Sequence, residues 1–304
     1  NTNGLCSQTL TPFYITTIGG YADVKTIPSG GFVMGNCMDP LEGYADELPV
    51  HTVSVSAVAM DRYEVCLAFW NEVYLWATNH GYSLAAADGK DAASPAVNMT
   101  WYDAVKWCNA RSEKKERVPC YYTDNSLLVP YRAGETTIDN DCVNWGANGY
   151  RLPTEAEWEK AARGGNPGLR FAWSDNNTIQ HDQANYYSTN SYPYDVSLTR
   201  GHHPLYSAGA ASWAAPVNAF ASNGYGFHNL TGNVWEWCWD WYSVGWYNQP
   251  AASADDSRGP LTGVFRVQRG GCFMDDAFFA RSAMRECGAP WYRYSDTGLR
   301  CVRQ

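Results

Sequence analysis

The sequence has no run of about 18 consecutive apolar residues, so we expect no transmembrane helix. Basic residues are few, because 22 Lys and Arg stand against 31 Asp and Glu and give a net charge of −9. No basic stretch offers the charge that neutralises phosphates, which argues against a nucleic-acid partner. No Cys-x-x-Cys pair is present, so a structural zinc site is not expected. The polar residues 1–4 lack the apolar core of a signal peptide, and we expect that any secretion signal has been removed or left out.

Aromatic side chains are abundant, with 14 Trp and 21 Tyr in 304 residues. This composition is typical of a loop-rich globular protein whose loops are fixed by large side chains. The 10 cysteines are many for a cytosolic protein and few for a disulfide scaffold. Cys120 and Cys142 flank a polar excursion and are the best candidates for a disulfide bond. Cys238, between Trp237 and Trp239, is expected to be a buried free thiol.

Local patterns predict strands and helices mainly in the first half of the chain. Strands are expected over residues 27–35 and over residues 51–57, where apolar residues alternate. Apolar and aromatic residues recur at helical spacing over residues 64–79, and Gly81 then ends the predicted helix.

Two capping boxes predict where two further helices begin. The pairs are Thr100 with Asp103 and Thr154 with Glu157. After residue 170 only short aromatic-rich runs remain, separated by Gly, Asn, Pro and Asp, and these predict short strands within long loops. No linker or repeat divides the chain, so we expect one domain over residues 1–304.

Four stretches are more specific than the composition. They are residues 149–163, residues 215–227, residues 229–237, and residues 266–271 taken together with residues 297–300. With the segments at Met34-Gly35 and Trp107-Cys108-Asn109, they closely resemble the formylglycine-generating-enzyme family, also called the sulfatase-modifying-factor domain, from about residue 22 to residue 303. The resemblance implies an α+β fold, a loop-rich variant of the C-type lectin fold with a small twisted antiparallel sheet and a few packed helices.

Residues 270–280 bear on catalysis. In the oxidases of this family two cysteines, five positions apart, follow a double glycine; they bind copper and exchange with a substrate cysteine, which requires ionised sulfur. Asp275 and Ala280 stand at these positions here. Alanine neither binds a metal nor forms a mixed disulfide. We therefore expect no copper, and we predict that the chain is not an enzyme.

The resemblance also implies a calcium site at the loop over residues 232–236. Amide, carboxylate and backbone carbonyl oxygens are the ligands that calcium prefers. Asn233 and Glu236 are therefore candidate ligands of a structural calcium ion. The alternative is that both side chains bond only the backbone.

Residues 272–296, hereafter the contact segment, place aromatic, sulfur-containing and acidic residues between positions typical of the family. This pattern of residue types resembles the variable region of diversity-generating-retroelement proteins, such as the treponemal variable protein. In those proteins a lectin-fold surface is randomised to bind new ligands. Rigid aromatic area beside acidic groups is typical of binding surfaces. The predicted contact residues are Cys272, Phe273, Met274, Asp275, Asp276, Phe278, Phe279, Met284, Glu286, Trp291, Tyr292 and Tyr294. The alternative is that these aromatic residues belong to the core.

The sequence thus predicts a non-catalytic, receptor-like or adhesin-like protein that binds an unknown protein or cell-surface ligand. We expect it to be secreted or displayed at the cell surface, with a lipid anchor on a removed N-terminal segment as one route. Two other functions stay open. One is an oxidase of the same family with a non-cysteine metal site at Asp275, and the other is a catalytically silent paralogue that binds cysteine-containing peptides.

Overall fold

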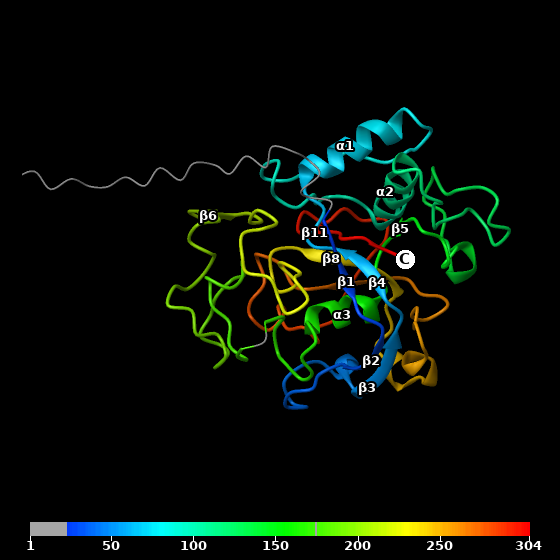
Figure 1. Ribbon diagram of the computed structural model, residues 1–304. Coiled ribbons are helices and arrows are strands. Elements are labelled where there is room, and N and C mark those ends of the chain that lie inside the picture. Colours follow the sequence, from blue (N-terminus) through cyan, green and yellow to red (C-terminus); the bar gives the residue numbers. More distant parts are fainter. Residues whose placement is uncertain (1–22, 174) are drawn as a thin grey trace, which may run out of the picture.

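Two four-stranded sheets form the framework of the computed structural model, which describes residues 23–173 and 175–304 (Figure 1). The first sheet contains, in order, β1 (Val24–Ile27), β4 (Val58–Asp61), β12 (Val302–Arg303) and β5 (Tyr150–Arg151). The second contains β10 (Glu286–Gly288), β9 (Arg266–Arg269), β8 (Trp235–Trp241) and β11 (Thr297–Gly298). Two further pairs are β2 (Gly30–Met34) with β3 (His51–Val55), and β6 (Ser207–Ala208) with β7 (Ala211–Ser212). The pairing is antiparallel except between β11 and β8, and the expected α+β class is confirmed.

Three helices accompany the sheets: α1 (Leu67–Thr78), α2 (Trp101–Lys114) and α3 (Glu155–Arg163). Both predicted capping boxes are confirmed, because the Thr100 and Thr154 hydroxyls accept hydrogen bonds from the backbone N–H groups of Asp103 and Glu157. Gly164, in the left-handed region, ends α3. Helices α1 and α2 pack together, and α3 lies against β1, β2, β3, β8 and β9.

Strand β8 runs through the middle of the molecule and is buried along its whole length. Alternate side chains of a strand point to opposite faces. Trp237 and Trp239 accordingly pack into the core around α1 and α2, and Cys238 packs with Trp158 of α3 in a second core. The prediction of a buried free thiol at Cys238 is confirmed.

The described part of residues 164–234 contains only the short strands β6 and β7, in agreement with the predicted loops. Hydrogen bonds of buried polar groups, and not a sheet, order this region. The Asp195 carboxylate accepts hydrogen bonds from the hydroxyls of Tyr186 and Ser188 and from the backbone N–H of Thr189. One carboxylate thus connects several turns of the loop, as long ordered loops require.

The predicted disulfide between Cys120 and Cys142 is wrong, because both residues are free thiols. The backbone bridge between Tyr121 and Val143 sets the register of the two segments. In this register the cysteines are diagonal neighbours, and diagonal Cα atoms lie roughly 7–8 Å apart. This separation exceeds the span of a disulfide.

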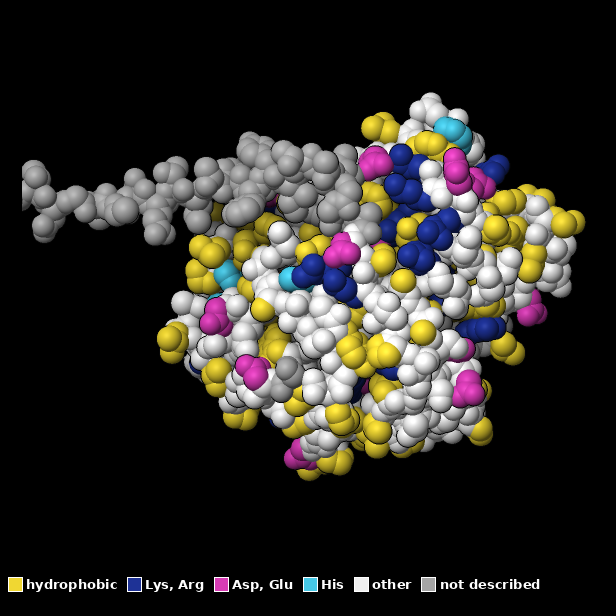
Figure 2. Space-filling view, in the orientation of Figure 1, with side chains coloured by type: hydrophobic (Ala, Val, Ile, Leu, Met, Phe, Trp, Pro, Cys, Tyr) yellow, Lys and Arg dark blue, Asp and Glu magenta, His cyan; other side chains and the backbone are white. Residues whose placement is uncertain are grey.

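Figure 2 shows Lys and Arg side chains gathered around α1 and α2 on one face, with acidic side chains among them. Lys114 forms an ion pair with Glu72 there, with 3.0 Å between Nζ and Oε1. Within residues 23–173 and 175–304, none of the helices combines the length and the apolar character needed to cross a bilayer. The expectation about residues 1–4 falls outside the described residues, and the single domain stays a prediction.

Candidate functional site

The contact segment begins at a double glycine that directs the chain away from β9. Gly270 and Gly271 have φ values of +104° and +77°, which side chains other than glycine rarely adopt. A Cβ atom on Gly271 would lie 2.8 Å from the carbonyl oxygen of Phe279. Glycine therefore permits both the turn and the close return of the segment onto its own beginning.

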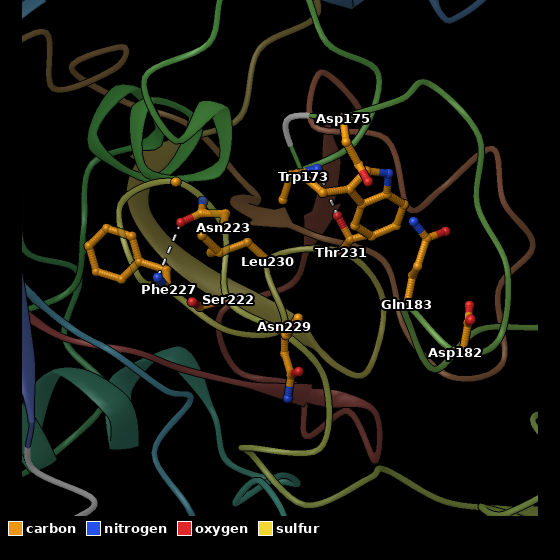
Figure 3. A pocket seen from close by; sticks show the side chains of 13 residues that line it. Trp173, Asp175, Asp182, Gln183, Ser222, Asn223, Phe227, Asn229, Leu230 and Thr231 are labelled. Carbon is orange, nitrogen blue, oxygen red and sulfur yellow. Dashed lines mark hydrogen bonds between the residues drawn. The ribbon is translucent and has the colours of Figure 1, made fainter.

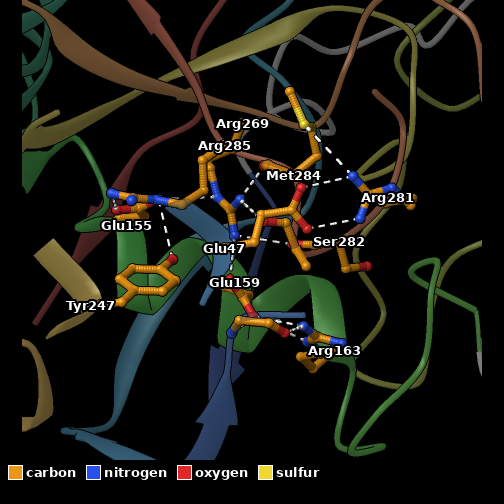
Figure 4. Close-up of polar contacts among 12 residues, drawn as sticks. Glu47, Glu155, Glu159, Arg163, Tyr247, Arg269, Arg281, Ser282, Met284 and Arg285 are labelled. Atoms are coloured by element: carbon orange, nitrogen blue, oxygen red, sulfur yellow. Dashed lines mark hydrogen bonds and ion pairs between the residues drawn. The ribbon is translucent and has the colours of Figure 1, made fainter. Parts of the chain in front are cut away.

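Three arginines attach the contact segment to the rest of the fold, and two of them, Arg281 and Arg285, are buried (Figure 4). Arg281 forms a two-pronged ion pair with Glu47, and both N–O distances are 2.7 Å. Arg285 pairs in the same way with Glu155, at the start of α3, at 2.7 and 2.9 Å. Arg293 reaches Asp103 of α2 at 2.8 Å. Three separate parts of the fold thus hold the segment through rigid guanidinium groups.

Arg269 of β9 extends this network beneath the segment, because it contacts Glu159 and donates to the backbone oxygen of Ser282. Burial acts to raise the pKa of Glu155, but the charges of Arg285 and Arg269 outweigh burial and leave that pKa below its ordinary value. The Glu155 carboxylate is therefore ionised and paired, as a buried charge must be.

The structure moves three predicted contact residues into the interior, which corrects the sequence-based assignment. Cys272 and Met284 pack with Trp235 in one core cluster. Phe273 packs beside Val234 in another, and only 7% of its surface is exposed. The chain that leaves the double glycine stays in the interior at first, because the Phe273 N–H donates to the backbone oxygen of Asn233, before the chain reaches the surface at Met274.

The other predicted contact residues reach the surface to different degrees. Met274, Trp291 and Tyr292 are 45%, 55% and 57% exposed. Half-buried positions are Asp275, Asp276, Phe278, Phe279, Glu286 and Tyr294. Exposed apolar side chains and buried arginines thus occur within the same segment.

Phe278 forms one wall of an open groove, the aromatic groove, whose volume is about 620 Å³. Its ring lies 5.0 Å from Tyr44 in an edge-to-face contact and 5.8 Å from Tyr192 in a stacked contact. Tyr192 stacks in turn on Tyr194 at 5.3 Å. Sequence reasoning missed these tyrosines, because they lie far from the contact segment in the sequence and carry no motif.

The sulfur chemistry of this face differs from that of a reactive thiolate. Burial raises the pKa of Cys272 well above its ordinary value, and the carboxylates of Asp275 and Asp296 add to this effect. Its sulfur accepts a hydrogen bond from the Met274 N–H at 3.4 Å. Ala280 is buried.

Cys287, the other thiol of the contact segment, lies in β10 opposite Val267. Burial, then Glu286, raises its pKa to about 11. Neither thiol of the segment is thus in an environment that favours the thiolate.

The predicted calcium ligands do not fit a calcium ion as the structure places them. Both Glu236 oxygens accept from Arg300, at 2.6 and 2.7 Å, so a guanidinium stands where a cation would bind. The Asn233 amide oxygen accepts from the Ala215 N–H at 2.7 Å, and its nitrogen donates to Glu64 at 2.8 Å. Among the described residues, no group of three or more His, Cys, Asp or Glu side chains is arranged to hold a metal. Calcium binding stays a prediction.

The fold and this face define a lectin-type α+β domain of the formylglycine-generating kind, with a contact segment in place of the paired cysteines. The chain belongs to the family of sulfatase-modifying factor enzyme 1-like domains, whose model matches residues 19–304. It is 35% identical to the formylglycine-generating enzyme of Thermomonospora curvata over 301 residues, which cover 91% of each chain. It is 32% identical to that of Streptomyces coelicolor, covering 91% of this chain and 87% of the enzyme.

Among solved structures, Treponema denticola variable protein 1 superposes with a TM-score of 0.68 at 27% identity, covering 92% of this chain and 94% of that protein. The structure of PvdO from Pseudomonas aeruginosa has a TM-score of 0.65 at 23% identity and shows the shared fold. The two resemblances drawn from the sequence, to the enzyme family and to the treponemal variable protein, are both confirmed.

Proposed function

We propose that this chain is a non-catalytic binding protein whose contact segment, with the adjoining aromatic groove, recognises a protein or cell-surface ligand. One observation carries the proposal. Arg281 and Arg285 point inward to buried carboxylates, whereas Met274, Trp291 and Tyr292 are exposed to solvent. Residues that fix the backbone and residues available for contact are therefore different residues.

This separation allows the exposed positions to change without loss of the fold. Removing a buried ion-pair partner is costly, while surface substitutions usually change stability by less than about 0.5 kcal/mol. Large aromatic side chains such as Trp291 and Tyr292 carry most of the energy in protein interfaces. The aromatic groove adds a concave area lined by Tyr44 and by Phe278 of the contact segment.

The first test compares exposed and buried aromatic positions. Trp291→Ser is expected to leave the urea midpoint nearly unchanged, whereas Trp237→Ser, at a fully buried position of β8, should cost about 3–5 kcal/mol. A display library randomised at Met274, Trp291 and Tyr292 should then yield binders to a test protein such as serum albumin. Loss of folding in most library members would contradict the proposal.

The enzymatic relatives supply the competing function, an oxidase with a metal at Asp275. Burial raises the pKa of this carboxyl, and one of its oxygens accepts from the Cys272 N–H at 3.2 Å. Oxygen uptake with a cysteine-containing peptide, present in wild type and absent in Asp275→Ala, would establish the oxidase. Binding of that peptide without oxygen uptake would favour a silent, peptide-binding paralogue.

We also propose that a retroelement diversifies the contact segment and that the protein acts outside the cell. The similarity to Treponema denticola variable protein 1 supports the proposal that the segment is diversified. Sequencing the DNA beside the gene is the test. A reverse transcriptase and a near-copy of the codons for residues 266–303, differing mainly at adenines, are expected, and the absence of both would remove this proposal.

A further inference from the structure

Two buried histidines lie side by side in the long loops between α3 and β8. The ring centroids of His181 and His203 are 5.0 Å apart, and each residue is only 6% exposed. The rings of Tyr186 and Tyr206 flank the pair, with centroids 5.0 Å from His181 and 4.6 Å from His203. His203 belongs to residues 199–206, hereafter the histidine loop. The pair thus connects the histidine loop to the loop around residue 181.

Hydrogen bonds fix the protonation state of the His203 ring. Its Nε2 lies 2.6 Å from the backbone oxygen of His181, which only accepts, so Nε2 carries a hydrogen. Its Nδ1 lies 3.1 Å from the backbone N–H of Leu205, which only donates, so Nδ1 offers a lone pair. Both bonds together require the neutral ring. A second proton, at Nδ1, would face the Leu205 N–H and remove that hydrogen bond.

The charges near the two rings do not compensate for an added proton. Asp195 attracts a proton at His181, but its carboxylate is already paired with Arg200 at 3.1 Å. In the described part of the chain neither ring is hydrogen-bonded to a carboxylate. His202, next to His203 in the chain, brings no negative charge. Burial lowers the pKa of His181 and of His203 below the ordinary value, which agrees with the neutral ring that the hydrogen bonds require.

Backbone contacts lead from the histidine loop to the contact segment. Gly201 and Ser188 exchange two backbone hydrogen bonds, each 2.8 Å long. The neighbouring Tyr187 donates its backbone N–H to the backbone oxygen of Asp275 at 2.8 Å. Asp275 directly follows Met274, which is an exposed residue of the contact segment. The backbone around Met274 is thus supported by a stretch that the histidine loop holds in turn.

The loop around His181 has open space on one side. Asp182 and Gln183, which follow it, line a cavity of about 470 Å³ between this loop and residues 221–231 (Figure 3). Asp182 is exposed, so water and salt screen its charge. Segments with few buried contacts open at a small cost in free energy. This side of the loop can therefore move without repacking of the core.

We propose that the histidine loop is an acid-sensitive latch, which supports the contact segment at neutral pH and releases it when His203 takes up a second proton. Its effect on ligand binding rests on the function proposed above, whereas the opening of the loop does not. The opened loop binds the proton at the ordinary histidine pKa of about 6.5, and the closed loop binds it only at lower pH. Above about pH 6.5 the latch therefore has its full strength, and it weakens as the pH falls below that value.

Hydrogen exchange measured by mass spectrometry tests the latch without any ligand. After correction for intrinsic exchange, the protection of backbone N–H groups in residues 184–206 should fall at least about tenfold from pH 7.5 to pH 5.0. This readout is local, whereas the free energy of global unfolding also depends on titrating groups elsewhere. His203→Gln keeps a donor for the His181 oxygen but does not titrate, so this variant should lose the acid response. His80→Gln replaces an exposed histidine that follows α1 and is the matched control.

Nitrogen NMR of wild-type protein labelled with ¹⁵N-histidine gives an independent answer if His203→Gln does not fold. The His203 ring is expected to be neutral at pH 7.5, with its hydrogen on Nε2. A hydrogen on Nδ1 at that pH would overturn the proposal. Equal protection of residues 184–206 at pH 7.5 and pH 5.0 would overturn it too, as would a folded His203→Gln variant that is as acid-sensitive as wild type.

Ligand release separates the latch from the proposed function. A variant selected from the display library at pH 7.5 should release its ligand at least about tenfold faster at pH 5.0, and adding His203→Gln should abolish this difference. Equal release rates at the two pH values while the loop opens would show that the latch does not control the contact segment. A library without binders would contradict the proposed function, and the opening of the loop would still be decided by hydrogen exchange.

Discussion

The sulfur atoms of Cys108 and Cys301 lie 3.5 Å apart in the buried core. Cys108 belongs to α2 and Cys301 directly precedes β12, so this contact joins the first helical layer to the end of the chain. Burial, and to a smaller extent the neighbouring Cys301, raises the pKa of the Cys108 thiol well above its ordinary value. The Cys108 thiol therefore stays protonated, and an oxidising environment can link it to the neighbouring sulfur of Cys301.

We predict that oxidation joins Cys108 to Cys301, whose positions are 193 residues apart. Closing a loop of this length stabilises a protein by about 5 kcal/mol in the chain-entropy treatment. Peptide mapping by mass spectrometry without reductant should find this pair in protein purified from an oxidising compartment. A linked peptide between Cys120 and Cys142 in its place would contradict the structure.

Arg281→Met is predicted to destabilise the fold by about 3–5 kcal/mol, because it leaves the Glu47 carboxylate buried without a partner. Adding Glu47→Gln should restore part of the loss, since the unpaired charge is then gone. Arg132→Met is the control, because its pair with Glu113 lies at the surface and is expected to contribute about 0–1 kcal/mol. Urea unfolding measures all three. Equal effects of Arg281→Met and Arg132→Met would show that the segment is held in some other way.

Gly271→Ala is predicted to destabilise the protein more than Gly209→Ala does. Both glycines have positive φ, but only at Gly271 would the new Cβ atom meet backbone, 2.8 Å from the Phe279 oxygen. Gly209 has no atom within 4 Å of that position, so its substitution should cost only about 1 kcal/mol of backbone strain. Thermal unfolding of the two variants provides the comparison. Similar losses would mean that the contact segment yields to the clash.

Stability is predicted to fall as the pH rises from 5 to 8, because burial, then the charge of Glu155, raises the pKa of Asp240 to about 8. In the unfolded chain this pKa is near 3.9. The folded state therefore holds a proton that the unfolded state has lost, and the contribution is full below about pH 4 and disappears as the pH approaches 8. The slope is at most about 1.4 kcal/mol per pH unit. Asp240→Asn should flatten the dependence in urea unfolding. An unchanged slope in this variant, matching that of Asp141→Asn, would refute the assignment.

Local sequence signals were sufficient for the elements whose ends are fixed by neighbouring residues. The capping pairs at Thr100 and Thr154 predict the starts of α2 and α3, because each cap bonds a backbone group three residues away. The glycine after Arg163 predicts the end of α3 in the same way. The family motifs extended this to the fold, since they recur in order along the chain.

The contacts between distant residues were decided by the tertiary structure alone. Sequence could not separate buried Met284 from exposed Trp291, because both stand in an irregular segment without helical or strand periodicity. Nor could it pair Cys108 with Cys301, or bring Tyr44 to Phe278, since the two residues of each pair lie far apart in the sequence. The sequence by itself determined the family, the starts of α2 and α3 and the missing cysteine pair, which depend on residue type and short spacing. The tertiary structure decided which side chains reach the surface, because burial results from the packing of the whole chain.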